Sequence, residues 1–201
     1  MIFEDDAYGA AGLASIRHAY SRHIPSAKVA IGASPAQVRA VADNVLLQHP
    51  QVIVLVMTTK IGIAMVEALH EAGFRGIRQQ IVAMSGIGPQ AFAAGLAAKD
   101  RGDVLISTIV PYPWMDGFVA NNLTLAYHDD MVAAGQGAAI GFSSFEGYID
   151  ACVLVLALQH AKAVTAQGLV DSLNNLGSFD LDGGAGGYPM NLAADNHMAT
   201  S

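Results

Sequence analysis

The chain has 201 residues, of which 53% are hydrophobic and 13% charged, with a mean hydropathy of +0.39 and a formal net charge of -7. This composition excludes a disordered chain. The ten Lys and Arg residues are few and scattered, which argues against a nucleic acid or an anionic membrane as partner. We therefore expect a folded protein with a small-molecule ligand.

Targeting and membrane signals are weak in this sequence. It begins Met-Ile-Phe-Glu-Asp-Asp, without the basic and apolar regions of a signal peptide, so we expect no export signal within it. The longest apolar run, residues 151–158, is far below the ~18 residues that suggest a membrane span, so direct membrane insertion is not expected. Cys152 is the only cysteine, which excludes an intrachain disulfide and leaves the compartment open.

Residues 1 to about 110 alternate short runs of Val and Ile with helical stretches, a pattern typical of βαβ units around a parallel sheet. The predicted strands are residues 27–31, 51–57, 80–84 and 103–110, with a short strand at 2–3. The predicted helices are residues 8–23, 35–48, 61–72 and 89–97. Ser34 before Pro35 indicates a helix start, and Gly73 a helix end.

The pattern changes after Pro111-Tyr-Pro-Trp114. Three helices are predicted, at residues 117–134, 144–163 and 165–176, without strands between them. The apolar stripe of the last helix, at Leu169, Val170 and Leu173, needs a surface to cover it. Residues 179–187 are rich in glycine and indicate a loop.

Four segments carry a resemblance to a known family. They are Asp5-Asp-Ala-Tyr-Gly9, the strand and hydroxyl residues of 52–59, Val104-Leu-Ile-Ser-Thr-Ile-Val-Pro-Tyr-Pro-Trp114, and Ser144-Phe-Glu-Gly-Tyr-Ile-Asp-Ala151. Their order resembles the type I periplasmic solute-binding proteins of ABC transporters, in the branched-chain amino acid (leucine/isoleucine/valine) binding group. With the tail from Phe179 they span nearly the whole chain.

The resemblance implies two α/β lobes with a ligand between them. Residues 1–110 would be most of the second lobe, 111–116 a hinge crossing, 117–177 helices of the first lobe, and 178–201 a glycine-rich return segment. The opening of the first lobe and the last strand of the second would lie outside the 201 residues, so the chain resembles a truncated member. The resemblance further implies permease subunits as partners of the full-length protein, a periplasmic location if that protein is exported, and neither catalysis nor a cofactor.

Candidate ligand contacts follow the predicted strands, because open parallel sheets bind ligands beyond the carboxyl ends of their strands. Tyr8 follows the first strand and offers a ring and a hydroxyl; the alternative is that Asp6 caps the helix and Tyr8 packs on the surface. Thr58 and Thr59 follow the strand at 51–57. Their hydroxyls suit a polar ligand, and the following helix start favours an anion; the alternative is N-capping by Thr59.

Ser85 follows the strand at 80–84. Amino-acid binders of the resembled family can carry an acid there for the ligand ammonium, whereas a serine brings no charge, so an amide, a carboxylate or an aromatic acid is as plausible a ligand. Tyr112, between Pro111 and Pro113, is a further candidate. The alternative is that Tyr112 and Trp114 pack in the joint between lobes.

Catalytic and metal motifs are missing from the sequence. The seven histidines show no zinc-ligand spacing, no phosphate-binding glycine loop occurs, and Cys152 lies in an apolar helical run that favours an inert thiol. We predict a non-enzymatic solute-binding component without a metal. Two alternatives are a truncated remnant without function and a small flavodoxin-like α/β enzyme.

Overall fold

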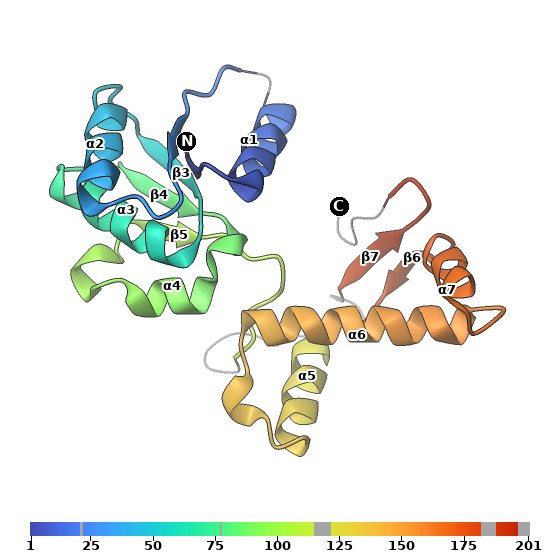
Figure 1. Ribbon diagram of the computed structural model, residues 1–201. Helices are drawn as coiled ribbons and strands as arrows, with labels where there is room; N and C mark the ends of the chain where they lie inside the picture. The colour runs from blue at the N-terminus through green and yellow to red at the C-terminus, as the bar shows by residue number, and fades with distance from the viewer. Residues whose placement is uncertain (21, 77, 115–121, 182–187, 197–201) are drawn as a thin grey trace. The chain divides into compact units, whose positions relative to one another are not determined.

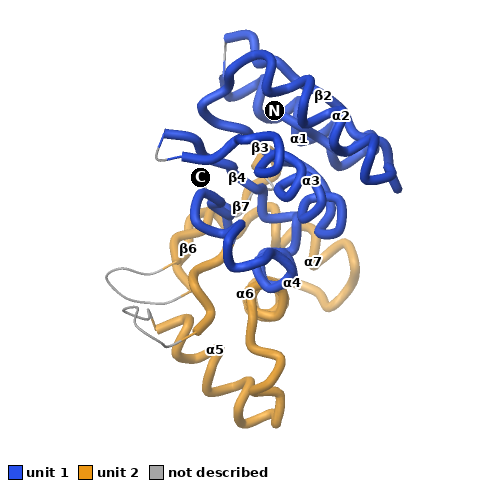
Figure 2. The backbone as a smooth tube through the Cα atoms, turned by 90° about the vertical axis from the view of Figure 1, so that its left-hand side faces the viewer, with its two compact units in different colours: residues 1–109 blue, residues 110–201 orange. Residues whose placement is uncertain are grey.

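The computed structural model describes residues 1–20, 22–76, 78–114, 122–181 and 188–196. It divides into two compact units, Met1–Ile109 and Val110–Ser201, which have different colours in Figure 2.

The first unit is built on a five-stranded parallel sheet with the order β2-β1-β3-β4-β5. Its strands are β1 (Ile2–Glu4), β2 (Ala27–Val29), β3 (Val52–Val56), β4 (Gln80–Ala83) and β5 (Val104–Ile106). Each lies within or next to a predicted strand, and β3 and β5 consist entirely of the branched side chains Val, Ile and Leu, of which Val and Ile favour a pleated surface. The predicted parallel sheet is confirmed.

Helices cover the two faces of this sheet unequally (Figure 1). The helical segments of the unit are α1 (Ala7–Ala19), α2 (Pro35–Leu46), α3 (Thr59–Glu71), η1 (Ser85–Ile87), α4 (Pro89–Gly95) and η2 (Ala98–Asp100). On the side of α2 and α3, strand residues such as Ile53, Leu55 and Ile81 are fully buried in one core. On the other side α1 covers β1 and β3, where Gly12 lies close against Val56.

Local sequence signals set the helix ends. Ser34 caps α2 through a reciprocal capping box with Gln37, and Pro35 occupies the first turn, as predicted. Gly73 has a φ of +93°, the left-handed conformation that glycine adopts without strain, directly after α3. Both predicted boundaries are confirmed.

The second unit is mostly helical. Its elements are α5 (Asn122–Ala133), η3 (Gly137–Ala139), α6 (Phe142–His160), α7 (Ala166–Leu173), β6 (Gly177–Asp180) and β7 (Pro189–Leu192). Tyr127 is fully buried in its core, where the ring stacks on Phe145 with centroids 4.4 Å apart. The hydroxyl of Tyr127 lies 2.6 Å from that of Ser144, so its polar end is satisfied.

The glycine-rich return segment is partly a sheet, which corrects the prediction of a loop from residue 179. β6 and β7 pair antiparallel, with Phe179 opposite Met190. Both strands are short and contain Gly or Pro, which weakens their local signal. The predicted residues 115–116 of the hinge, 117–121 of the helix, and 182–187 and 197–201 of the return segment lie outside the described residues.

α6 exposes much of its apolar surface within the structure. Its 19 residues are long and apolar enough, by length and composition alone, to cross a membrane, a test that core helices of soluble proteins also pass. Only 17% of the tested stretch is buried. Leu154, Val155 and Leu158 are among the exposed side chains, so one stripe of the helix has an uncovered apolar surface.

Candidate ligand-binding site

The candidate residues of the first unit follow three adjacent strands. Tyr8 lies in the first turn of α1 after β1, Thr58 and Thr59 follow β3, and Ser85 follows β4. Because the strands are parallel, these residues lie at the same edge of the sheet.

Tyr8 reaches across to the segment after β4. A Cβ atom on Gly86 would lie 2.3 Å from the phenol oxygen of Tyr8, so the ring lies directly over this glycine. Burial raises the pKa of Tyr8, a hydrogen bond with the Gly86 backbone lowers it, and the charge of Asp6 raises it; the net shift is upward. Asp6 also caps α1 by accepting the Gly9 N–H at 2.7 Å. The helix cap by Asp6, which was part of the alternative, is therefore present together with the Tyr8–Gly86 contact.

Thr59 makes a long-range contact and is not the helix cap, so the alternative of N-capping by Thr59 is wrong. Its hydroxyl donates to the carbonyl oxygen of Ile87 at 2.5 Å, which joins α3 to the segment after β4. The N-cap is Thr58, whose side chain makes no capping hydrogen bond. The Thr58 side chain is exposed, and its hydroxyl has no hydrogen-bond partner within the described part of the chain.

Ser85 is held through its backbone. Its N–H donates to the hydroxyl of Ser107 at 3.1 Å. Sequence reasoning missed Ser107 because the last strand was predicted to run to residue 110, whereas β5 ends at Ile106. The hydroxyl of Ser85 has no partner among the residues that the structure describes. Thr58 and Ser85 thus leave two hydroxyls at this edge for a ligand.

Glu4 was also missed. It is the last residue of β1 and only 3% exposed, and its carboxylate accepts the Thr58 N–H at 2.8 Å. An acidic residue beside an apolar strand was the available sequence signal, but the predicted strand stopped at Phe3. Glu4 places a buried carboxylate behind the Thr58–Thr59 turn.

Tyr112 belongs to the second unit and packs among aromatic rings. Its ring centroid lies 5.1 Å from that of Trp114 and 6.4 Å from that of Phe142, both edge-on. Tyr112 and Trp114 therefore pack against each other, and their expected packing in the joint between lobes stays a prediction. A ligand contact by Tyr112 stays a prediction.

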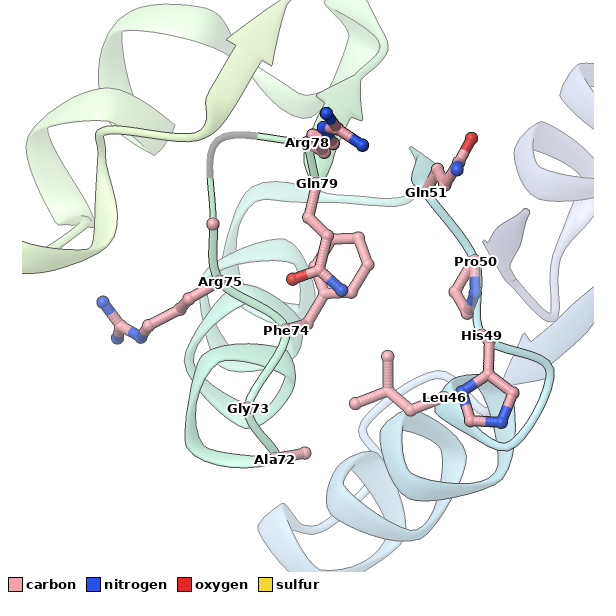
Figure 3. Close-up of a pocket in the computed structure, with 11 residues that line it drawn as sticks. Leu46, His49, Pro50, Gln51, Ala72, Gly73, Phe74, Arg75, Arg78 and Gln79 are labelled. Carbon is pink, nitrogen blue, oxygen red and sulfur yellow. The ribbon is translucent and has the colours of Figure 1, made fainter.

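A cavity of about 750 Å³ lies at the other end of the sheet (Figure 3). It is lined by the loops that precede β3 and β4, including Pro50, Phe74 and Gln79. The Arg75 side chain turns away from it and bonds the carbonyl of Lys99 and the carboxylate of Asp100. This cavity shares no residue with the candidate site, and the amino ends of parallel strands are not where such sheets hold ligands.

Two features of the described residues bear on the predicted absence of a metal site and of a reactive thiol. No cluster of three or more His, Cys, Asp or Glu side chains there is arranged to hold a metal. Cys152 is half-buried; burial raises the pKa of its thiol, a hydrogen bond with Tyr148 lowers it, and the charge of Asp130 raises it, for a net upward shift. A raised pKa disfavours the thiolate that a nucleophile needs.

The family model for periplasmic binding proteins matches residues 1–201. The chain belongs to the periplasmic binding protein family. A comparison with curated proteins found no match. The parallel sheet flanked by helices agrees with the solved structures of this family, which confirms the predicted type I fold.

Three solved structures illustrate the likeness. A possible leucine/isoleucine/valine-binding protein from Rhodopirellula baltica SH 1 is 25% identical, with a TM-score of 0.80, over 100% of this chain and 53% of its own. An extracellular ligand-binding receptor from Verminephrobacter eiseniae is 20% identical, with a TM-score of 0.74, over 94% and 53%. An ABC transporter substrate binding protein from Aeropyrum pernix is 16% identical, with a TM-score of 0.72, over 98% and 53%. This periplasmic binding protein chain spans about half the length of the structures it matches.

Proposed function

We propose that this chain is the ligand-gripping part of the solute-binding component of an ABC transporter, and that its ligand is a small amino acid-like or carboxylate solute. One observation carries the proposal. The segments after β1, β3 and β4 meet through the Tyr8–Gly86 and Thr59–Ile87 contacts, beside two hydroxyls, of Thr58 and Ser85, that have no partner among the described residues. The names of the R. baltica and A. pernix proteins support the solute class and the transporter.

Each proposed contact has a distinct chemical role. The Tyr8 ring covers the apolar part of the solute, while the hydroxyls of Thr58 and Ser85 bond its polar head. Thr59 positions the segment after β4 through its bond to Ile87. Tyr112 contacts the solute from the second unit. None of these groups performs chemistry, so the proposed role is binding without catalysis, cofactor or metal.

The lobe assignment is part of the same proposal. Residues 1–110 form the second lobe, 111–116 cross between lobes, 117–177 supply helices of the first lobe, and 178–201 return. In the full-length protein, closure over the solute would present a surface to permease subunits in the periplasm. In this proposal the opposite wall of the cleft belongs to a part of the first lobe outside the 201 residues.

An NMR titration of the ¹⁵N-labelled chain tests the proposal, because it detects weak binding at millimolar solute. The solutes are a panel of amino acids and small carboxylates. We expect backbone amide shifts to concentrate at Tyr8, Thr58 and Ser85–Gly86. Shifts confined to the cavity around Pro50 and Phe74, or no shift with any solute, would contradict it and favour the remnant or the flavodoxin-like enzyme.

Two variants sharpen the result. Tyr8→Ala should weaken binding by about tenfold or more, since a buried aromatic contact is worth roughly 1–2 kcal/mol. The matched control is Tyr20→Ala, because Tyr20 lies just past the other end of α1 and is 51% exposed. Equal weakening by both substitutions would show that the Tyr8 ring is not a ligand contact.

A further inference from the structure

Among the described residues, no side-chain cation pairs with the carboxylate of Glu4. The residue is only 3% exposed, and within the described residues its side-chain hydrogen bond is the one from the Thr58 N–H. Lys28, on the neighbouring strand, pairs with Asp5 at 3.0 Å instead. Buried carboxylates are normally paired because removing such a charge from water is costly.

The N-terminus of α3 supplies part of the missing compensation. Thr58 is the N-cap of this 13-residue helix, and its own side chain makes no capping bond. The free N–H groups at a helix N-terminus carry partial positive charge and favour an anion. In this chain the anion is Glu4, which belongs to the adjacent strand β1. Glu4 therefore occupies one of the N–H groups at this helix terminus, that of the N-cap residue.

The buried carboxylate of Glu4 changes which ligand group the neighbouring hydroxyls of Thr58 and Ser85 would bind. A ligand carboxylate at Thr58 or Ser85 would approach a buried carboxylate, whose repulsion opposes the attraction of the helix terminus. An ammonium or an amide N–H group would be attracted to the same charge. Lys60 acts in the opposite direction, but it is exposed, and solvent and salt screen an exposed charge more than a buried one.

We propose that Glu4 is a positioning and charge-selecting residue: it holds the Thr58 turn and makes this edge accept an amine or amide group in preference to a carboxylate. The inference rests on the proposed function and narrows its ligand class. A solute that also carries a carboxylate would direct that group away from α3. Ser85 contributes a hydroxyl without charge, and Glu4 contributes the charge from behind the turn.

Three probes with the same branched carbon chain test this in the 201-residue chain: leucinamide, 4-methylpentanamide and 4-methylpentanoate. NMR titration at Thr58 and Ser85 gives each dissociation constant. We expect the unsubstituted chain to bind both amides at least about tenfold more tightly than the carboxylate. Glu4→Gln keeps an oxygen that can accept the Thr58 N–H and removes the charge, so it should reduce the ratio between leucinamide and 4-methylpentanoate by about tenfold.

Two further variants separate charge from structure. Glu4→Leu removes the hydrogen bond as well and should weaken all three probes together. Lys60→Met changes an exposed side chain and should widen the preference for amides, which keeps the test usable if a Glu4 variant does not fold. Thermal melting reports folding for each.

The outcomes distinguish failure of the proposed role of Glu4 from failure of the proposed function. Equal binding of amide and carboxylate probes, or an unchanged ratio in folded Glu4→Gln, overturns the role of Glu4 and leaves solute binding standing. Binding by members of the wider solute panel but by neither amide also overturns it. If no compound binds at the Tyr8, Thr58 and Ser85 edge, the proposed function fails, and the role of Glu4 fails with it.

Discussion

Nδ1 of His70 lies 2.9 Å from a carboxylate oxygen of Asp100. Its other ring nitrogen, Nε2, lies 2.9 Å from Asp103, and the His70 side chain is 1% exposed. When the imidazole is protonated, both nitrogens donate and the ring is a cation between two carboxylates. Arg75 also contacts Asp100, so this network joins the end of α3 to the segment before β5.

Substitution of His70 should destabilise the first unit. His70→Gln cannot satisfy both carboxylates and leaves buried Asp100 short of a cation, so we expect a loss of about 3 kcal/mol in the free energy of unfolding. Urea denaturation measures it. His18→Gln, at an exposed position of α1, is the control and should change stability by less than about 0.5 kcal/mol. Similar losses in both variants would show that the network contributes nothing specific.

Acid should weaken the same network through Asp100. Burial raises the pKa of this carboxyl, but hydrogen bonds from His70 and Arg75 and the charges of Lys99 and His70 outweigh it, so the net pKa is below the ordinary 3.8. A lowered folded-state pKa gives stability that is complete above pH 3.8 and is lost as the pH falls through the lower folded value. Urea denaturation between pH 7 and pH 3, compared with Asp100→Asn, checks this. A variant with the same acid profile as the unsubstituted chain would contradict it.

Gly86→Ala should displace Tyr8 while the fold persists. The added methyl carbon would lie 2.3 Å from the phenol oxygen of Tyr8, which is too close for two atoms that are not bonded. The tyrosine ring would therefore move, and the end of a tyrosine side chain can move at low cost. We expect solute binding to fall as far as in Tyr8→Ala, with little change in melting temperature. Gly102→Ala is the matched control, because an added Cβ there has no neighbour within 4 Å. Retained binding in Gly86→Ala would show that the ring position over Gly86 is unimportant.

The uncovered stripe of α6 should make the isolated chain associate or bind a hydrophobic dye. Leu154 and Val155 are 44% and 52% exposed, one turn before exposed Leu158, and apolar surface of this kind commonly marks a missing partner. Replacing Leu154 and Val155 together with Gln should lower dye fluorescence and the sedimentation coefficient. Leu47→Gln, at a position 76% exposed in the first unit, is the control. A dye-silent monomer before substitution would refute the prediction.

The sequence predicted the parallel sheet well because its strands are apolar runs separated by helices with clear start and stop residues, as at Ser34-Pro35 and Gly73. It placed the candidate residues after neighbouring strands for a related reason, because parallel strands end at one edge of the sheet, and ligand binding at that edge stays a prediction. It failed at element boundaries, since β5 ends at Ile106 and not at residue 110. Thr58 and Thr59 are chemically alike, and the local pattern could not decide which of them caps α3.

Long-range partners were beyond the reach of local patterns. The Glu4–Thr58 bond joins residues 54 positions apart, and the His70–Asp100 bond joins residues 30 apart. β6 and β7 were missed for a similar reason, because what stabilises them is the cross-strand contact between Phe179 and Met190. The aromatic packing around Tyr112 likewise depends on Phe142, a residue of a later helix.

The place of β1 between β2 and β3 has a consequence for biosynthesis. β1 (Ile2–Glu4) is synthesised before its neighbour β3 (Val52–Val56), so this part of the sheet must wait for later residues before β1 is paired on both sides. Until then this apolar segment of the nascent polypeptide stays open to wrong pairing. Peptide tags fused directly before Met1 would begin next to the centre of this sheet, where the terminal amine already donates to the Pro25 carbonyl at 2.9 Å, so expression vectors should carry the tag at the other terminus.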